Sequence, residues 1–101
     1  MRYRKIDAEA QAFKGSLMQN ISEGGVCLST YEFLPLHIKL AMEIPLVPGS
    51  SPIRGTSRVA WVKSSAFGDQ YEVGAEFTDI TQEEILRIGK FVFNKSLEKI
   101  I

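Results

Sequence analysis

The chain is expected to turn at Asn20-Ile21-Ser22-Glu23-Gly24-Gly25 and to continue directly into the apolar run Val26-Cys27-Leu28. The first stretch places an amide, a hydroxyl and two glycines between two strand-like segments. Asn and Ser side chains can cap backbone groups or point outward to a ligand, and glycine permits positive φ and close approach by a ligand. Successive exposed N–H groups in such a turn can bind an anion. Two interpretations therefore stay open, a plain hairpin turn or half of a ligand site.

The composition is that of one ordinary globular domain. The chain has 101 residues, of which 45% are hydrophobic and 24% are charged, enough to bury one core without a metal or disulfide. Its 12 basic and 12 acidic residues balance, which argues against a nucleic-acid partner, because such a partner requires a basic surplus. The single cysteine, Cys27, is expected to be a buried structural thiol. No apolar run could span a bilayer and no signal peptide is present, so we expect a cytoplasmic domain or a cytoplasmic piece of a larger protein.

Patterns of period two predict a series of strands before one helix. Turn formers such as Pro48-Gly49-Ser50-Ser51-Pro52 separate these segments. Many short strands in a small chain favour a closed or nearly closed barrel, which leaves no long exposed edges. The expected strands cover residues 8–13, 16–21, 25–30, 37–44, 53–64 and 71–77.

Side-chain alternation assigns faces within the last two strands. In residues 53–64, Val59 and Trp61 are predicted to share one face. The opposite face is predicted to carry Arg58, Ala60 and Val62. In the final strand the alternation separates an apolar set from a second set, with Tyr71, Val73, Ala75 and Phe77 on one side and Glu72, Gly74 and Glu76 on the other.

A change of period after the last strand predicts a helix over residues 81–98. Thr81-Gln82-Glu83-Glu84 has the form of a capping box, with Thr81 as N-cap and the Glu84 side chain reaching back to it. Apolar residues then recur at helical spacing, and the helix is expected to cover one end or side of the barrel. Its last turns carry more apolar surface than one face needs. This surplus either packs on the barrel or holds a partner, which could be a second copy of the chain.

The basic cluster Arg2-Tyr3-Arg4-Lys5 has no apolar periodicity, so residues 1–7 are expected to form a flexible arm. Arginine pairs bidentately with phosphate and with the guanine edge, and it stacks on aromatic planes. A flexible arm can become ordered around a small anionic nucleotide. The alternative is that these are ordinary exposed basic residues near a terminus.

Several parts of the chain together resemble the PilZ family of domains. The turn matches the family signature Asp/Asn-x-Ser-x-x-Gly, with Asn20, Ser22 and Gly25 in the three defined places. The segment Arg58-Val59-Ala60-Trp61-Val62 is similar to a family strand with a Trp after small apolar residues, and Tyr71-Glu72-Val73-Gly74-Ala75-Glu76-Phe77 is similar to its Gly-x-x-Phe strand. The predicted helix falls where the family helix falls. The resemblance therefore covers nearly the whole chain.

The resemblance implies a mainly β fold, a six-stranded antiparallel PilZ-type β-barrel with a C-terminal α-helix. The chain would be a single domain over residues 1–101, with a basic arm (1–7), a barrel (8–78) and a helix (81–98). The family also implies a receptor for the bacterial second messenger cyclic di-GMP that acts on a partner protein or a fused effector domain. The implied ligand-binding residues are Arg2, Arg4, Lys5, Asn20, Ser22, Gly25, Trp61 and Gly74.

These candidates have different expected roles. Asn20 and Ser22 would bind a guanine edge or a phosphate, and Gly25 would allow close approach. The basic residues of the arm would clamp the phosphates and stack. Trp61 is expected in the core or at the barrel mouth more than as a stacking surface. No enzyme activity, catalytic residue, metal or cofactor is expected, because the sequence holds no nucleophile–base pair, clustered carboxylates or metal ligand set.

The arm departs from the family pattern, which is Arg-x-x-x-Arg upstream of the turn. Aligning Tyr3-Arg4-Lys5-Ile6 with the usual ending puts Lys5 on the second arginine and Met1 on the first. Lysine lacks the planar fork and the stacking face of arginine. Either Arg2 and Arg4 serve in a shifted register, or the chain starts inside a longer protein that carries the missing residue. The departure leaves a second function open, a PilZ-fold interaction module of the pilus or motility type that binds no nucleotide.

Overall fold

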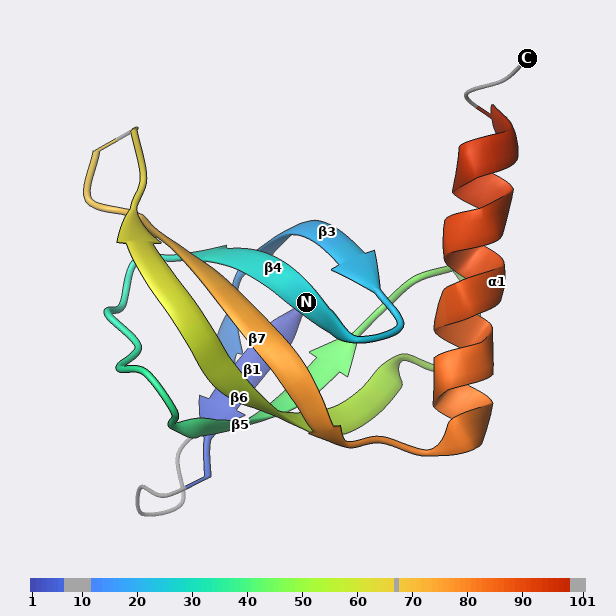
Figure 1. Cartoon of the computed structure of the whole chain (residues 1–101), viewed down its shortest axis with the longest axis horizontal. Coiled ribbons are helices and arrows are strands. Elements are labelled where there is room, and N and C mark those ends of the chain that lie inside the picture. The colour runs from blue at the N-terminus through green and yellow to red at the C-terminus, as the bar shows by residue number, and fades with distance from the viewer. Residues whose placement is uncertain (7–11, 67, 99–101) are drawn as a thin grey trace.

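The computed structural model describes residues 1–6, 12–66 and 68–98. Within these ranges seven strands precede one helix, α1 (Gln82–Glu98), as Figure 1 shows. This order confirms the mainly β fold with a C-terminal helix. The strands are β1 (Arg2–Lys5), β2 (Lys14–Gly15), β3 (Leu17–Ser22), β4 (Gly25–Thr30), β5 (Lys39–Ile44), β6 (Ile53–Ser64) and β7 (Tyr71–Asp79).

The strands form one antiparallel sheet in the order β2-β1-β5-β6-β7-β4-β3. β2 and β3 lie at the two edges of this order, yet only Ser16 separates them in the chain. The chain itself therefore joins the two edges, and the sheet curls into a half-barrel. The strand expected over residues 8–13 lies mostly outside the described residues. Its described end, Ala12 and Phe13, is not in a strand, and the next two residues form the short strand β2.

β1 differs from the flexible arm expected for residues 1–7, and it raises the strand count above the expected six. It pairs with β5 in a continuous register from Arg2↔Glu43 to Lys5↔Leu40. The Tyr3 side chain is only 2% exposed and belongs to the core. A strand of four residues directs few side chains inward. The burial of Tyr3 alone therefore produced no hydrophobic periodicity that could have predicted the strand.

The core fills the inner face of the curled sheet. Alternation in β7 holds as predicted, because Val73 and Ala75 are buried whereas Glu76 is exposed. Leu34, from the loop after β4, and Ile88, from α1, complete the core. The remaining buried apolar side chains come from the strands and are Tyr3, Val26, Leu28, Leu40, Met42, Ile44, Ile53 and Val59.

α1 begins at the expected cap, since the Glu84 N–H donates to the Thr81 hydroxyl over 3.2 Å. The Glu84 side chain does not complete the capping box. It accepts instead from the backbone N–H of Arg54 at 3.1 Å and from the Arg87 guanidinium at 2.8 Å. In Figure 1 the helix stands beside the barrel, and its later turns extend past the strands. No helix in the described ranges is long and apolar enough to cross a membrane.

Candidate functional site

A β-bulge at Ala60 turns Trp61 to the outer face of the sheet. Val59 pairs with Ala75 and Trp61 pairs with Gly74, so Ala60 is an extra residue in β6. Val59 is fully buried, whereas Trp61 is 42% exposed. The prediction that Val59 and Trp61 share a face is therefore wrong. The inserted residue shifts the alternation by one position, so every following side chain changes face.

The Trp61 indole packs on β7 directly over Gly74, where no side chain obstructs it. A Cβ at Gly74 would lie 2.1 Å from indole Nε1 and 2.2 Å from Cε2. Such distances are far inside van der Waals contact, so only glycine fits beneath the ring. The expectation of a core or barrel-mouth position for Trp61 is corrected: the ring covers backbone on the outer surface.

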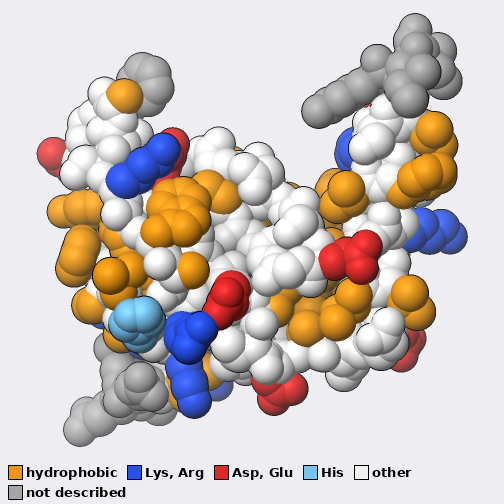
Figure 2. Space-filling view, in the orientation of Figure 1, with side chains coloured by type: hydrophobic (Ala, Val, Ile, Leu, Met, Phe, Trp, Pro, Cys, Tyr) orange, Lys and Arg blue, Asp and Glu red, His pale blue; other side chains and the backbone are white. Residues whose placement is uncertain are grey.

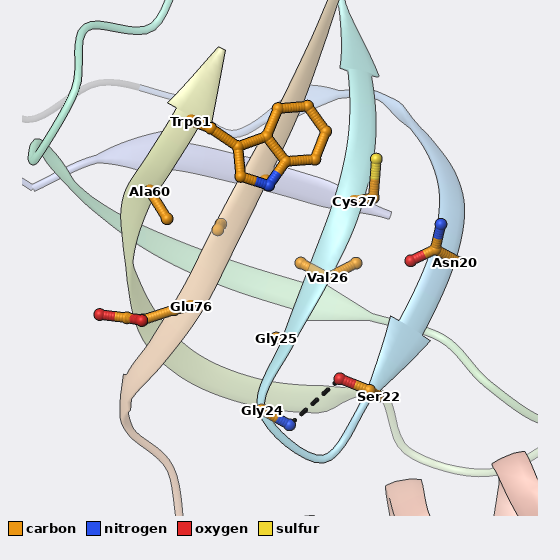
Figure 3. A pocket seen from close by; sticks show the side chains of 11 residues that line it. Asn20, Ser22, Gly24, Gly25, Val26, Cys27, Ala60, Trp61 and Glu76 are labelled. Carbon is orange, nitrogen blue, oxygen red and sulfur yellow. Dashed lines mark hydrogen bonds between the residues drawn. The ribbon is translucent and has the colours of Figure 1, made fainter.

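Trp61 and the β3–β4 hairpin border a hollow of about 220 Å³ on this outer face. In Figure 3 the indole leans over β7 from one side, and Asn20 and Ser22 face it from β3 on the other. Five candidates from the sequence are thus brought together. The lining consists of Asn20, Ser22, Gly24, Gly25, Val26, Cys27, Ala60, Trp61, Gly74, Ala75 and Glu76.

The two polar residues of the signature have different surroundings. The Ser22 hydroxyl accepts a hydrogen bond from the Gly24 N–H over 3.3 Å, drawn as the dashed line in Figure 3. Ser22 therefore shapes the turn as well as facing the hollow. Asn20 is exposed, and its side-chain amide makes no hydrogen bond within the described part of the chain. Both donors and the acceptor of Asn20 are thus free for a ligand.

The close approach of β7 to β4 requires a glycine at position 25. A Cβ at this position would lie 2.3 Å from the carbonyl oxygen of Ala75 on β7. Among the described glycines a left-handed φ occurs at Gly49 and Gly68, so the signature glycines Gly24 and Gly25 do not use the positive φ that glycine permits. The close approach made possible by Gly25 is that of β7, which brings the hairpin beside Trp61.

The three basic candidates of the arm lie outside the hollow. Arg2 forms an ion pair with Glu43, and Lys5 Nζ lies 2.8 Å from a Glu32 carboxylate oxygen. The Arg4 guanidinium lies 5.5 Å from the centroid of the Phe13 ring. All three belong to β1, which β5 separates from β6. The strand that replaces the flexible arm is the reason for this separation.

Comparison with known families agrees with this fold and this turn. The family model described as the PilZ domain matches residues 3–94. The chain belongs to the PilZ family. PilZ domains are receptor and adaptor domains. No curated protein and no solved structure matches the chain significantly.

The outer face of this PilZ domain also carries charged groups that the sequence did not single out. Glu76 lines the hollow, and its carboxylate accepts from the Arg58 guanidinium. Lys63 Nζ lies 3.1 Å from Glu72. Figure 2 shows basic and acidic side chains adjacent to each other on both sides of apolar ones over β6 and β7. Opposite charges on two neighbouring predicted strands were a signal for such pairs. Simple alternation places Arg58 and Lys63 on opposite faces, however, and only the bulge at Ala60 brings both pairs to the outer face.

Cys27 is the second lining residue whose surroundings differ from expectation. Its side chain is partly exposed at the hollow, where the sequence predicted a buried structural thiol. Burial raises the pKa of the Cys27 thiol, and the nearby Glu72 carboxylate raises it further. The thiol is therefore neutral and weakly nucleophilic at neutral pH. Within the described ranges no three His, Cys, Asp or Glu side chains could hold a metal ion.

Replacing Gly74 with alanine is expected to expel the Trp61 ring from the surface of this PilZ domain. The added methyl group occupies the space of Nε1, and the partly exposed indole can rotate away more easily than β7 can move. Trp61 is the one tryptophan of the chain, so tryptophan fluorescence reports the solvent exposure of this ring directly. We expect a red-shifted emission and stronger quenching by iodide. Gly15→Ala is the control, because a Cβ there meets nothing within 4 Å; equal spectra for both variants would contradict the packing.

Proposed function

We propose that this PilZ domain is a receptor for cyclic di-GMP. The ligand would bind over the hollow and change a surface that a partner protein or a fused effector domain recognises. One observation carries the proposal: the fold gathers the signature turn and the Trp61–Gly74 pair around one hollow in a chain of this receptor family. The ligand is a bacterial messenger, so the proposal includes a cytoplasmic location. It requires no catalytic group, metal or cofactor.

The chemistry of the hollow suits a purine nucleotide. The free Asn20 amide and the Ser22 hydroxyl offer donors and acceptors to a guanine edge or a phosphate oxygen. The Trp61 ring offers an exposed flat surface, and stacking of a base on an aromatic ring contributes about 1–3 kcal/mol. Gly24 and Gly25 keep the floor of the hollow free of side chains. A guanine could therefore stack on Trp61 and be held at its edge by β3.

The signature turn is also connected to α1. A Cβ on Gly89 of the helix would lie 2.9 Å from Glu23 Oε1, which places the Glu23 carboxylate directly against the helix. Leu86, Phe93 and Leu97 form an exposed apolar stripe on α1, with Leu86 and Phe93 63% and 62% exposed. A ligand that moves the turn would shift Glu23 and, through it, the helix. This contact supports α1 as the surface that a partner recognises, and a second copy of the chain is one such partner.

The second candidate is a PilZ-fold interaction module that binds no nucleotide. The observation in its favour is the position of the arm cations, since Arg2 and Lys5 form ion pairs on β1 far from the hollow. The charged group that lines the hollow is moreover the carboxylate of Glu76, which repels an anion. In this alternative the apolar stripe of α1 would bind the partner without a messenger.

Calorimetric titration with cyclic di-GMP separates the two candidates. We expect saturable binding of cyclic di-GMP and none of GTP. Asn20→Ala should weaken binding about tenfold, because a hydrogen bond to a charged or buried partner contributes about 1.5 kcal/mol. Asn94→Ala is the matched control, an exposed asparagine of α1 outside the hollow, and should leave affinity unchanged. Absence of saturable binding by the unaltered chain would refute the receptor function and leave the interaction module.

A further inference from the structure

We propose that Arg58 and Lys63 of β6, and not the basic residues of β1, hold the phosphates of the ligand. The inference rests on the proposed function, because it assumes a cyclic dinucleotide at the hollow. It assigns phosphate recognition to two side chains that lie outside both the basic segment of residues 1–7 and the turn of residues 20–25. Together with Trp61 they would form one continuous recognition strip along the outer face of β6.

The hollow by itself cannot satisfy such a ligand. Its volume of about 220 Å³ lies below the roughly 300–1,000 Å³ of typical small-molecule pockets. Part of a dinucleotide must therefore lie on the surface beside it. A cyclic dinucleotide also carries two phosphate charges, whereas the charged group of the lining is the Glu76 carboxylate. The cations must come from the surroundings of the hollow.

The register of β6 with β7 places two cations at that border. Arg58 lies opposite Glu76, Trp61 opposite Gly74, and Lys63 opposite Glu72. The indole is thus framed by one ion pair on each side along the strand. Lys63 Nζ lies 5.7 Å from the centroid of the indole, and the Arg58 guanidinium contacts the lining residue Glu76. A base stacked on Trp61 would have its flanking phosphates within reach of both side chains.

Both cations can change partner at little cost. The Arg58 side chain is 46% exposed and the Lys63 side chain 65% exposed. Exposed ion pairs contribute little to stability, because water screens them and two long side chains must be ordered. A phosphate accepts two parallel hydrogen bonds from a guanidinium as a carboxylate does. Arg58 therefore needs only a side-chain rotation to exchange Glu76 for a ligand phosphate.

The cations of β1 would require a larger change. Lys5 is held at 2.8 Å by Glu32, and Tyr3 between the two arginines is buried in the core. To reach the hollow, β1 would have to leave its ladder with β5 and expose the Tyr3 ring. Arg58 and Lys63 already lie on the correct face. The geometry therefore favours β6 as the source of positive charge.

The partner carboxylates of Glu76 and Glu72 provide a second test of the inference, in which the expected change in affinity has the opposite sign. Each carboxylate competes with the phosphate for its cation and repels the ligand once the cation has moved. Removing the charge of Glu76 should thus strengthen binding, whereas removing Arg58 should weaken it. A purely structural role for the Arg58–Glu76 pair would give the same sign for both changes.

The test is calorimetric titration with cyclic di-GMP of the unaltered chain, Arg58→Ala, Lys63→Ala and Glu76→Gln. We expect Arg58→Ala to bind at least about tenfold more weakly and Lys63→Ala severalfold more weakly, with a shallower salt dependence for both. Glu76→Gln should bind severalfold more tightly. The matched control is Arg54→Ala, which removes an exposed, ion-paired arginine of the same strand away from the hollow and should change affinity by less than about twofold.

The outcomes distinguish this inference from the proposed function. If the unaltered chain binds and Arg58→Ala resembles Arg54→Ala, the assignment to β6 is wrong and the receptor function stands. Arg2→Ala and Lys5→Ala are titrated in the same way, and if either of them causes the loss instead, β1 supplies the charge and the assignment to β6 is wrong. If the unaltered chain shows no binding, both proposals fall. Circular dichroism of each variant confirms that the sheet is intact before affinities are compared.

Discussion

Replacing Gly25 with alanine is expected to lower the free energy of unfolding by about 2–4 kcal/mol. The new Cβ would lie 2.3 Å from the Ala75 carbonyl oxygen and 3.1 Å from the Glu76 Cα. Both atoms belong to the backbone of β7, so they cannot move unless β4 separates from β7. Overpacking of this kind typically costs about 1–3 kcal/mol, and the lost strand pairing adds to it. Guanidinium denaturation followed by circular dichroism measures the change.

The control for this prediction lies one residue earlier in the same turn. A Cβ on Gly24 meets only the Ser22 hydroxyl oxygen, at 3.9 Å, and its φ is not left-handed. Gly24→Ala should therefore change stability by less than about 0.5 kcal/mol. In thermal melts the melting temperature of the Gly25 variant should fall by about 8–16 °C or more. The melting temperature of the Gly24 variant should fall by a few degrees at most. Equal stability of the two variants would contradict the close contact of β4 with β7.

Replacing Glu32 with alanine is expected to destabilise the fold by about 2–3 kcal/mol. The Glu32 carboxylate accepts from the Tyr3 hydroxyl at 2.9 Å, and the Lys5 and Lys14 ammonium groups lie at 2.8 and 2.9 Å. It thereby ties β1 and β2 to the loop after β4. Hydrogen bonds to a charged group contribute about 1.5–3 kcal/mol, and the variant would also leave the hydroxyl of the buried Tyr3 without its partner. Chemical denaturation at neutral pH measures the loss.

This contribution should depend on pH. Partial burial alone would raise the pKa of Glu32, but the hydrogen bonds from Lys5, Lys14 and Tyr3 outweigh it and lower the pKa from 4.5 to about 2. A carboxyl whose pKa is lower in the folded state stabilises fully above its unfolded pKa and loses this effect as the pH falls. The stability difference between the unaltered chain and Glu32→Ala should thus be constant near neutrality. It should shrink as the pH falls from about 4.5 towards 2.

Glu98→Ala provides the comparison for Glu32. Glu98 pairs with Lys95 at 3.5 Å, and both side chains are more than half exposed. Loss of such a pair should cost less than about 0.5 kcal/mol. A similar small loss for Glu32→Ala would mean that β1 is held by its backbone ladder and Tyr3 packing alone.

Local sequence signals were enough for most elements of the fold. The limits of β4 and β6 agree with the predicted segments, because apolar runs bounded by turn formers mark strands without reference to the rest of the chain. The Thr81 cap likewise marks the start of α1. The signature turn and the Trp61–Gly74 segments were recognisable for the same reason, and the fold brings them together at one hollow.

Other features depend on pairing between distant segments, which no local pattern contains. The sequence by itself determined the order of elements from β3 to α1, the family and the residue types at the hollow. Only the tertiary structure decided that β1 pairs with β5, that Ala60 is extra against β7 and that Gly25 meets Ala75. A one-residue bulge reverses the face that the following side chains take. Both this bulge and the pairing of β1 with β5 depend on a partner strand that is not adjacent in the sequence. For that reason Trp61 lines the candidate site and Arg58 pairs with the lining residue Glu76, whereas Arg2 and Lys5 form their ion pairs elsewhere.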